Sequence, residues 1–397
     1  MNSIFRLMTA AIFTLAFSVA AFAQITIQGQ SGTFPTIQSA INAAQPNDAV
    51  LVNGGTHAEN LLIAKPIRVT GLNGAEINPA TGIPVTVNNP AGPVHINGFT
   101  VRVPAGQFGV NYDGLASNTS NTGTIHSCKF IGGLTVIFAK EADFRIVSNQ
   151  FNGFTGAAIV VAGNTGNTSR AIRASSNIIN GGAVAQGQFL AGTVGIVASN
   201  GNLLVSANKI TNALRGIQIA NSAGTISSNT LTNAAMGIDV TNSPNMLIEQ
   251  NSSNITSAFS AAINTQLIST FAIRLIGSNS VSILNNTLVG GNAGIICTSQ
   301  SANATITANI VNGAFVGFQG GGIGLTFTLN SSAEVHFNNI ENNVFGLQAI
   351  GASANATNNW WGAANGPSGA GGGSGDSIGA GIPFFPFLTA PNPNAGV

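Results

Sequence analysis

A motif built around asparagine recurs along most of the chain and constrains the fold more than any other feature. In each copy an apolar residue, two small residues, Asn and a second apolar residue precede a polar turn and a Gly-Ile or Gly-Leu pair. The recurring positions are Asn149, Asn177, Asn208, Asn229, Asn251, Asn286, Asn309, Asn338 and Asn358. Cys128 occupies the same position one unit earlier, and Asn97 is expected to fill it earlier still.

The spacing of these residues predicts a β-solenoid. A unit of 20 to 23 residues, lengthened in some copies by an insertion, accounts for every spacing. Short strands repeated at this length, without helical periodicity, are typical of stacked coils that contact only their neighbours. The apolar residue three places before each Asn, such as Ile146 or Ile226, should point inward, because side chains alternate along a strand. Asn suits a sharp corner, since it tolerates left-handed backbone and its stacked amides can bond from coil to coil. We therefore predict an all-β fold, a single-stranded parallel β-helix.

Composition excludes several other classes of protein. Only 6% of the residues are charged and 44% are hydrophobic. A helical bundle needs charged residues on its solvent faces, and a disordered chain would be richer in charge and poorer in apolar residues. The 12 basic and 11 acidic residues leave a net charge of +1. A nucleic-acid partner is not expected, because such a groove needs a basic excess.

Distinct segments flank the repeat. Residues 1–23 have the pattern of a signal peptide, with a short apolar run and an Ala-Phe-Ala cleavage site that ends at Ala23. Residues 24–48 are expected to form an N-terminal cap with a short helix that begins near Thr36 and ends before Pro46. The β-helix is assigned to residues 49–362, and a Gly-rich tail and C-terminal cap to residues 363–397. We expect a secreted, periplasmic or cell-surface protein with no membrane span after signal removal.

The ends and the repeat together resemble a known family. The segment TIQSAINAAQPNDAVLVNGG from Thr36 is similar to the N-terminal cap and first coil of right-handed parallel β-helix repeat proteins with the pectin-lyase-like fold. The segment NNWWGAANGPSG from Asn358 is similar to the C-terminal cap of a bacterial exported branch. The resemblance implies a right-handed helix and a role of the carbohydrate-binding or sugar-hydrolase type. It is weak for function, because one fold supports many activities.

A cluster of charged residues is the first candidate for a polysaccharide-binding site. Its members are His126, Glu141, Asp143, Arg145 and Arg173. Arg145 and Arg173 each lie four residues before a repeat Asn, so they should stack on adjacent coils and face solvent, with His126 on the coil before. Basic groups beside two carboxylates can hold an acidic sugar and supply an acid or a base. The alternative interpretation is a solvated ion-pair patch.

A polar column after the Gly-Ile pair is the second candidate. We expect Gln218, Asp239 and Asn264 on successive coils, with Arg215 beside them. Such a column can present amides and a carboxylate to sugar hydroxyls. The alternative interpretation is an ordinary polar outer face.

No metal or other cofactor is expected. Two carboxylates near Arg145 make a weak Ca²⁺ site, since this ion usually takes about 6–8 oxygen ligands. No Cys or His spacing indicates zinc. Cys128 and Cys297 are separated by too many coils for a disulfide, and Cys128, which fills a repeat Asn position, is expected to be a buried thiol. His57, His95 and His336 are interpreted as isolated structural or surface residues.

These observations favour a secreted protein whose partner is a polysaccharide or a cell-surface glycan. They leave open whether the glycan is also cleaved by a lyase or a glycoside hydrolase reaction, because no complete set of catalytic carboxylates is visible. The alternative is a non-catalytic, adhesin-like structural solenoid. A periplasmic maturation role like that of a copper-associated member of the family has least support, since the chain holds only 4 Met and scattered His.

Export gives the first testable prediction. Protein recovered from the exported fraction of its native host should begin at Gln24, because the small residues at positions 21 and 23 suit signal cleavage. Mass spectrometry of the intact protein measures this directly. Finding residues 1–23 still attached in that fraction would contradict the assignment.

Overall fold

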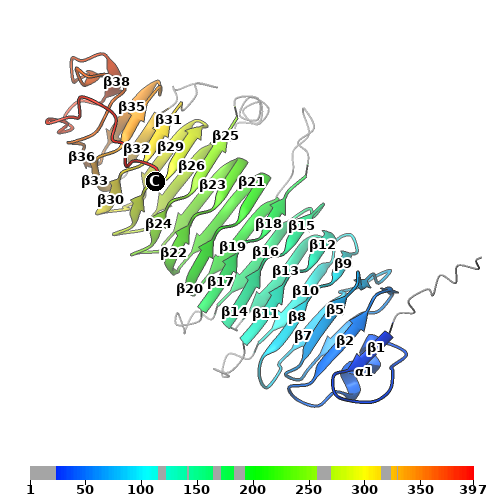
Figure 1. Ribbon diagram of the computed structural model, residues 1–397. Coiled ribbons are helices and arrows are strands. Elements are labelled where there is room, and N and C mark those ends of the chain that lie inside the picture. The colour runs from blue at the N-terminus through cyan, green and yellow to red at the C-terminus, as the bar shows by residue number, and fades with distance from the viewer. Residues whose placement is uncertain are drawn as a thin grey trace, which may run out of the picture.

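The protein is an elongated stack of β-strand coils (Figure 1). The computed structural model describes residues 24–114, 122–140, 143–163, 171–182, 193–256, 270–313, 323–328 and 330–397. In these ranges the strands form one sheet of 14 strands and a second of 24. Each coil contributes one strand to each of three faces, and the chain advances from the helix α1 at one end to β36 and β38 at the other.

The first face is the 14-stranded sheet. Its strands pair in chain order and in parallel, except that β1 runs antiparallel to β2. They are β1 (Gln24–Ile27), β2 (Ala49–Asn53), β5 (Arg68–Leu72), β8 (Val94–Asn97), β11 (Thr122–His126), β14 (Asp143–Val147), β17 (Ala171–Ser175), β20 (Asn202–Ser206), β22 (Ala223–Ser227), β24 (Leu247–Glu249), β27 (Ser282–Leu284), β30 (Ala304–Thr307), β33 (Ser332–His336) and β36 (Ser353–Asn355).

The second face is one part of the 24-stranded sheet and follows the first face along each coil. Its strands are β3 (Thr56–His57), β6 (Glu76–Ile77), β9 (Thr100–Val103), β12 (Lys129–Gly132), β15 (Gln150–Asn152), β18 (Ile178–Asn180), the first parts of β21 (Lys209–Ala220) and β23 (Thr230–Thr241), β25 (Ser252–Ile255), β28 (Thr287–Gly290), β31 (Ile310–Asn312) and β34 (Asn339–Glu341). β21 and β23 bend at Asn212 and Asn233, which both have a φ of 53°. The bend carries both strands onto the third face.

The third face completes each coil. Its strands are β4 (Leu61–Ile63), β7 (Val85–Asn88), β10 (Phe108–Asp113), β13 (Thr135–Lys140), β16 (Ala157–Ala162), β19 (Val194–Ser199), the second parts of β21 and β23, β26 (Phe271–Ile276), β29 (Ala293–Thr298), β32 (Ile323–Thr328), β35 (Phe345–Ile350), β37 (Pro367–Gly369) and β38 (Gly375–Ile378). Apolar side chains from all three faces meet inside the coils. The predicted fold class, a right-handed parallel β-helix with a short N-terminal helix, is confirmed.

The helix α1 (Ile37–Ala43) covers the N-terminal end of the stack. Thr36 is its N-cap, and its hydroxyl accepts a hydrogen bond from the Ser39 amide in a capping box. Ile37, Ala40 and Ile41 are buried and form the apolar stripe by which the helix packs on the first coil. The Glu59 carboxylate accepts hydrogen bonds from the first two amides of the helix, at 2.9 and 3.0 Å.

A continuous chain of asparagine amides links the corners between the first and second faces. Asn149 donates through its backbone amide and its Nδ2 to Oδ1 of Asn177, at 3.0 and 3.1 Å. Nδ2 also donates to the Ile125 carbonyl at 3.0 Å. The same pattern repeats at each coil down to Asn338, which donates to Asn359. These side chains are buried, and each finds partners without water.

The structure corrects two positions in this ladder. Its last member is Asn359, and Asn358 is the corner residue before it. Asn97 is not a member, because the register places Phe99 opposite Cys128. The residue before each ladder position, rather than the ladder Asn, takes the left-handed conformation, with φ between 52° and 60° from Ser127 to Asn358. The Asn side chain therefore stabilises the corner by bonding, while its predecessor makes the turn.

A second ladder, made of serines, was not predicted. It lies at the corner between the third and first faces, where the amides of Ser222, Ser243 and Ser278 each donate to the hydroxyl of the next serine at 3.0 to 3.1 Å. The residue before each serine again has a positive φ. Ser is common throughout the chain, so its recurrence at this corner is hard to recognise from the sequence.

The C-terminal end is closed by aromatic residues and by a tail that runs back over the stack (Figure 1). Trp361 is fully buried. The tail contacts successive corners of the first ladder: the Asn358 amide donates to the Pro386 carbonyl, and the Gly396 amide donates to the Ala308 carbonyl at 2.7 Å. Asn392 lies between them and donates to Oδ1 of Asn339 at 2.7 Å.

Both cysteines are buried, unpaired thiols; the burial of Cys128 was predicted, and that of Cys297 was not. Burial raises the pKa of Cys128 and that of Cys297 to about 12. They are therefore protonated at neutral pH and inert toward thiol reagents in the folded protein.

The ladder gives the second testable prediction. Asn229→Leu removes the acceptor of the Asn208 amide and the donor to the Val205 carbonyl. Each buried polar group left unpaired should cost about 1–3 kcal/mol in the free energy of unfolding. Asn254→Leu is the matched control, because Asn254 is exposed on the second face and should change stability by less than about 0.5 kcal/mol. Equal denaturation midpoints for the two variants would contradict this account of the ladder.

Candidate functional site

A line of basic side chains runs along the outer surface of the first face. The strand register pairs Arg68 with His95, His95 with Thr124, Thr124 with Arg145, and Arg145 with Arg173. Neighbouring coils are about 4.8 Å apart. Five successive coils therefore place these side chains at matching strand positions. Four of them carry a guanidinium or an imidazole, and the third carries Thr124. These five residues are called the basic column below.

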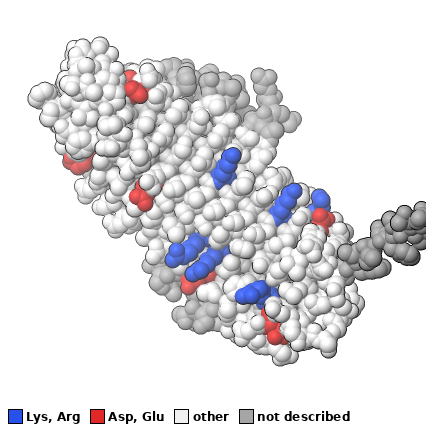
Figure 2. Space-filling model, in the orientation of Figure 1, with Lys and Arg blue, Asp and Glu red and all other residues white. Residues whose placement is uncertain are grey.

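The strand period explains why the basic column faces outward. Arg145 lies between buried Phe144 and Ile146, and Arg173 between buried Ile172 and Ala174. Alternation then directs both arginines to solvent, as predicted. Figure 2 shows two adjacent basic side chains with acidic atoms beside them, on a surface that carries few other charges.

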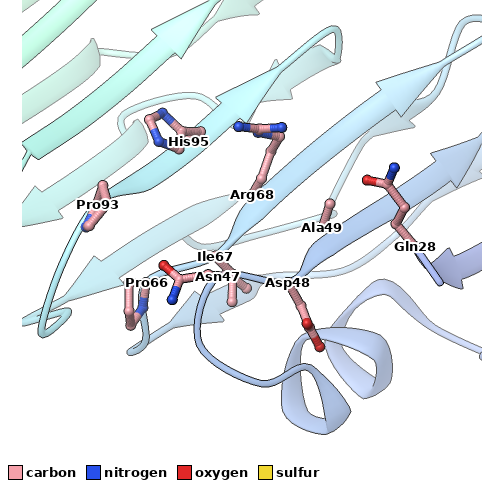
Figure 3. A pocket seen from close by; sticks show the side chains of 9 residues that line it. All are labelled: Gln28, Asn47, Asp48, Ala49, Pro66, Ile67, Arg68, Pro93 and His95. Atoms are coloured by element: carbon pink, nitrogen blue, oxygen red, sulfur yellow. The ribbon is translucent and has the colours of Figure 1, made fainter. Parts of the chain in front are cut away.

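Two hollows follow the basic column and share His95. One, of about 280 Å³, is lined by residues that include Asn47, Arg68 and His95. The other, of about 290 Å³, is lined by His95 and by the side chains around Arg145 and Arg173. Figure 3 shows the Arg68 guanidinium and the His95 ring projecting from neighbouring strands on the same side of the sheet. The two hollows lie one after the other along the basic column, with His95 in the lining of both, and together they are called the track below.

His95 is the titratable group at the centre of this track. Burial lowers its pKa below the usual 6.5, and the Arg68 cation lowers it further. Both effects disfavour the charged imidazolium, so His95 is neutral at neutral pH. Acidification adds a positive charge between Arg68 and Arg145.

The carboxylates beside the track are engaged in structural hydrogen bonds. Asp48 accepts from the Gln45 amide at 2.8 Å, and Asp143 accepts from the Ala171 amide at 2.8 Å. In the described part of the chain, no carboxylate lies within 4.0 Å of a guanidinium nitrogen of Arg145 or Arg173. Asp48 lines the first hollow with Arg68, and Asp143 lines the second with Arg145 and Arg173, so the described residues of the track carry three guanidinium groups and two carboxylates.

The other predicted members of the first cluster are separate from the basic column. His126 is exposed but lies in the next outward column, opposite Val147 and Asn97. Glu141 lies outside the described residues. His95 was interpreted as isolated, and the structure corrects this, because the insertions between early coils hide its alignment with Arg68 and Arg145.

The second predicted column is only partly correct. Gln218 and Asp239 are register partners, as expected, but the next position on the following coil is held by Arg274 rather than Asn264. Asn264 itself lies outside the described residues. Asp239 is 3% exposed, so it is not part of an open polar face.

Arg274 and Arg215 both contact the buried Asp239 carboxylate. Arg274 makes a bidentate interaction with Asp239: its Nε donates to Oδ1 at 3.0 Å and its Nη2 donates to Oδ2 at 2.7 Å. Nη1 of Arg215 lies 3.9 Å from Oδ2. This group is called the arginine pair below. Arg274 was not predicted, because an insertion separates it from the regular repeat.

Within the described ranges, no three His, Cys, Asp or Glu side chains come together as metal ligands. In the same part of the chain, no helix is both long and apolar enough to cross a membrane.

Comparisons with known proteins agree with this fold. Residues 193–361 match the protein family described as a right handed beta helix region. No curated protein sequence matches the chain. A solved structure of a mannuronic acid specific polysaccharide family 6 lyase from human gut microbiota is 11% identical, with a TM-score of 0.44 over 80% of this chain and 81% of that one. The periplasmic alginate epimerase AlgG is 10% identical, with a TM-score of 0.37 over 89% of this chain and 98% of that one. Similarity this distant does not indicate a function.

The environment of His95 gives the third testable prediction. The pKa of His95, measured by NMR titration of the ring protons, should lie below 6.5. Arg68→Gln should raise it, because a nearby cation is removed, but not to 6.5, because burial remains. Arg102→Gln, which removes a cation from the second face, should leave it unchanged. A His95 pKa that does not respond to Arg68→Gln would contradict this description.

Proposed function

We propose that the protein binds an acidic polysaccharide along its first face, with the basic column as the anchor. The observation that carries this proposal is the alignment of Arg68, His95, Arg145 and Arg173 at one offset on neighbouring coils. This row holds three guanidinium groups, and His95 adds a fourth cation when it is protonated. Several cations in one line suit a polymer that carries repeated negative charges.

The spacing of the row favours a polysaccharide over other anions. Coils about 4.8 Å apart are close to the length of one sugar unit, so a chain that lies along the axis can place successive carboxylates near successive coils. Arg recognises a carboxylate through two parallel N–H bonds, which adds orientation to the attraction. The balance of 12 basic and 11 acidic residues does not favour nucleic acid.

The shape of the site suits a polymer. The two hollows are open to solvent and follow each other along the basic column with His95 in common, so an extended chain can contact both. Thr122 and Thr124 line the second hollow and can bond sugar hydroxyls between the charged positions. The signal-peptide pattern places such a protein outside the cytoplasm, where glycans of this kind occur.

Binding is a better-supported activity than cleavage. The two carboxylates beside the track are engaged with backbone amides, so neither is poised as a free acid or base. Neutral His95 can accept a proton, but the described residues provide no second group placed to protonate a leaving sugar. We therefore propose a binding protein and treat cleavage as a separate outcome of the test.

Titration calorimetry with short galacturonate oligomers gives the fourth testable prediction. The double variant Arg145→Gln, Arg173→Gln should bind about tenfold more weakly, a loss of about 1.4 kcal/mol. Lys129→Gln with Lys209→Gln is the matched control, since it removes two exposed cations from the second face and should bind like the parent. Parent affinity should rise as the pH falls below 6.5, because His95 then becomes charged, and His95→Gln should abolish this rise.

Other outcomes separate the alternatives. Equal affinity of the parent and the double variant would place the site elsewhere. Parent protein that binds no acidic or neutral glycan from a panel would favour the adhesin-like structural role. Depolymerisation of galacturonate chains, seen by size-exclusion chromatography, would show an enzyme instead of a binding module.

A further inference from the structure

We propose that the arginine pair on the third face is a second anion-binding site, so that one molecule holds two acidic polysaccharide chains at once. This inference rests on the proposed function of the first face and adds a cross-linking activity to it.

The register builds the arginine pair from three successive coils. Gln218, Asp239 and Arg274 occupy one offset on β21, β23 and β26. Arg215 lies three residues before Gln218, at the offset that Met236 and Phe271 hold on the next two coils. The two arginines therefore approach Asp239 from the coils on either side of it.

The charge of the arginine pair is not balanced. Two guanidinium groups share one carboxylate, which leaves a net positive charge at a surface with few other ions. Nε and Nη2 of Arg274 are bonded to Asp239, so the N–H groups of Nη1 remain for a ligand. The Arg215 guanidinium donates no hydrogen bond to any of the described residues, and its contact with Asp239 is an ion pair at 3.9 Å.

The arginine pair is held in place before any ligand arrives. Asp239 is buried, with its side chain 4% exposed, and its two hydrogen bonds hold the Arg274 guanidinium in one orientation. Arg274 also lies over the Phe271 ring, 4.5 Å from its centre. Arg215 and Arg274 are still 33% and 27% exposed, so their free N–H groups reach solvent. A site that is already ordered loses less side-chain entropy on binding.

The chemistry of the arginine pair suits a sugar carboxylate. Guanidinium groups bind carboxylates through paired N–H bonds, and a partly buried position strengthens the attraction relative to open surface. Gln218 is half-buried one coil before Asp239, and its amide can bond a neighbouring hydroxyl. The ligand class is therefore the same as on the first face, an acidic glycan.

The position of the arginine pair makes the two sites independent. The basic column lies on the first face, and the arginine pair on the third face, across the corner that contains Asn200, Asn221 and Asn242. A chain extended along the axis of one face does not cross that corner. Two chains bound on two faces are bridged by the protein.

The experiment uses the full-length mature protein with two probes. Calorimetry with short galacturonate oligomers counts sites, and light scattering with long polygalacturonate detects bridging. The test variant is Arg215→Gln, which leaves the bidentate interaction between Arg274 and Asp239 intact. Arg215→Lys keeps the charge, and Lys209→Gln removes an exposed cation from the second-face part of the same strand. Melting temperatures confirm that each variant is folded.

The expected result is a loss of bridging when the third-face site is removed and a reduction when the first-face site is weakened. The parent, Arg215→Lys and Lys209→Gln should bind two oligomers per molecule and scatter light with the long polymer. Arg215→Gln should bind one oligomer and fail to bridge. The double variant Arg145→Gln, Arg173→Gln should keep the third-face site, bind at the first face about tenfold more weakly, and bridge less than the parent.

The two proposals fail in different ways. If Arg215→Gln keeps the stoichiometry and the bridging of the parent, the second site is overturned. If the parent binds one oligomer and the Arg145, Arg173 variant binds it about tenfold more weakly, the function of the first face stands and this inference falls. If only Arg215→Gln reduces binding, the second site stands and the first-face function falls. A parent that binds no oligomer overturns both.

Discussion

The asparagine ladder is the interaction on which the rest of the structure depends. Each buried amide accepts two hydrogen bonds from the previous coil and donates to the next, so a ladder position without Asn would leave backbone groups unpaired in an apolar core. The ladder also fixes the register. A shift of one residue would break these bonds and reverse which side chains face inward. Insertions between strands are tolerated as long as the next Asn returns to its place.

Because the register is fixed, chemistry on this protein is arranged in columns. Residues at one offset from the ladder meet on neighbouring coils even when they are far apart in sequence. Arg68 and Arg173 belong to one surface feature for this reason, and so do Asp239 and Arg274. A chain with few charges can then gather several of them into a small number of places. The first face carries the basic column and the third face carries the arginine pair, although the same repeating backbone forms both faces.

Sequence periodicity predicted the coil, the inward residues and the stacking of Arg145 on Arg173, because these follow from a fixed distance to a recognisable Asn. Periodicity failed to align residues where no repeat Asn lies nearby, or where two adjacent asparagines could hold the ladder position. His95 lies before the ladder begins, and Arg274 follows an insertion, so counting along the chain could not align either one. At the C-terminal end two adjacent asparagines compete for the ladder position, and only the backbone conformation shows that Asn359 holds it.

The tail that runs back over the last corners changes how the stack can come apart. In a solenoid each coil is held by its neighbours alone, so the end coil can peel away first and expose the next one in a zipper-like process. Here Pro386, Asn392 and Gly396 are bonded to different coils. The last coil cannot leave without releasing the segment that also holds the coils beneath it. The terminal coils therefore unfold as one cooperative unit, and fraying from that end is replaced by an all-or-none step.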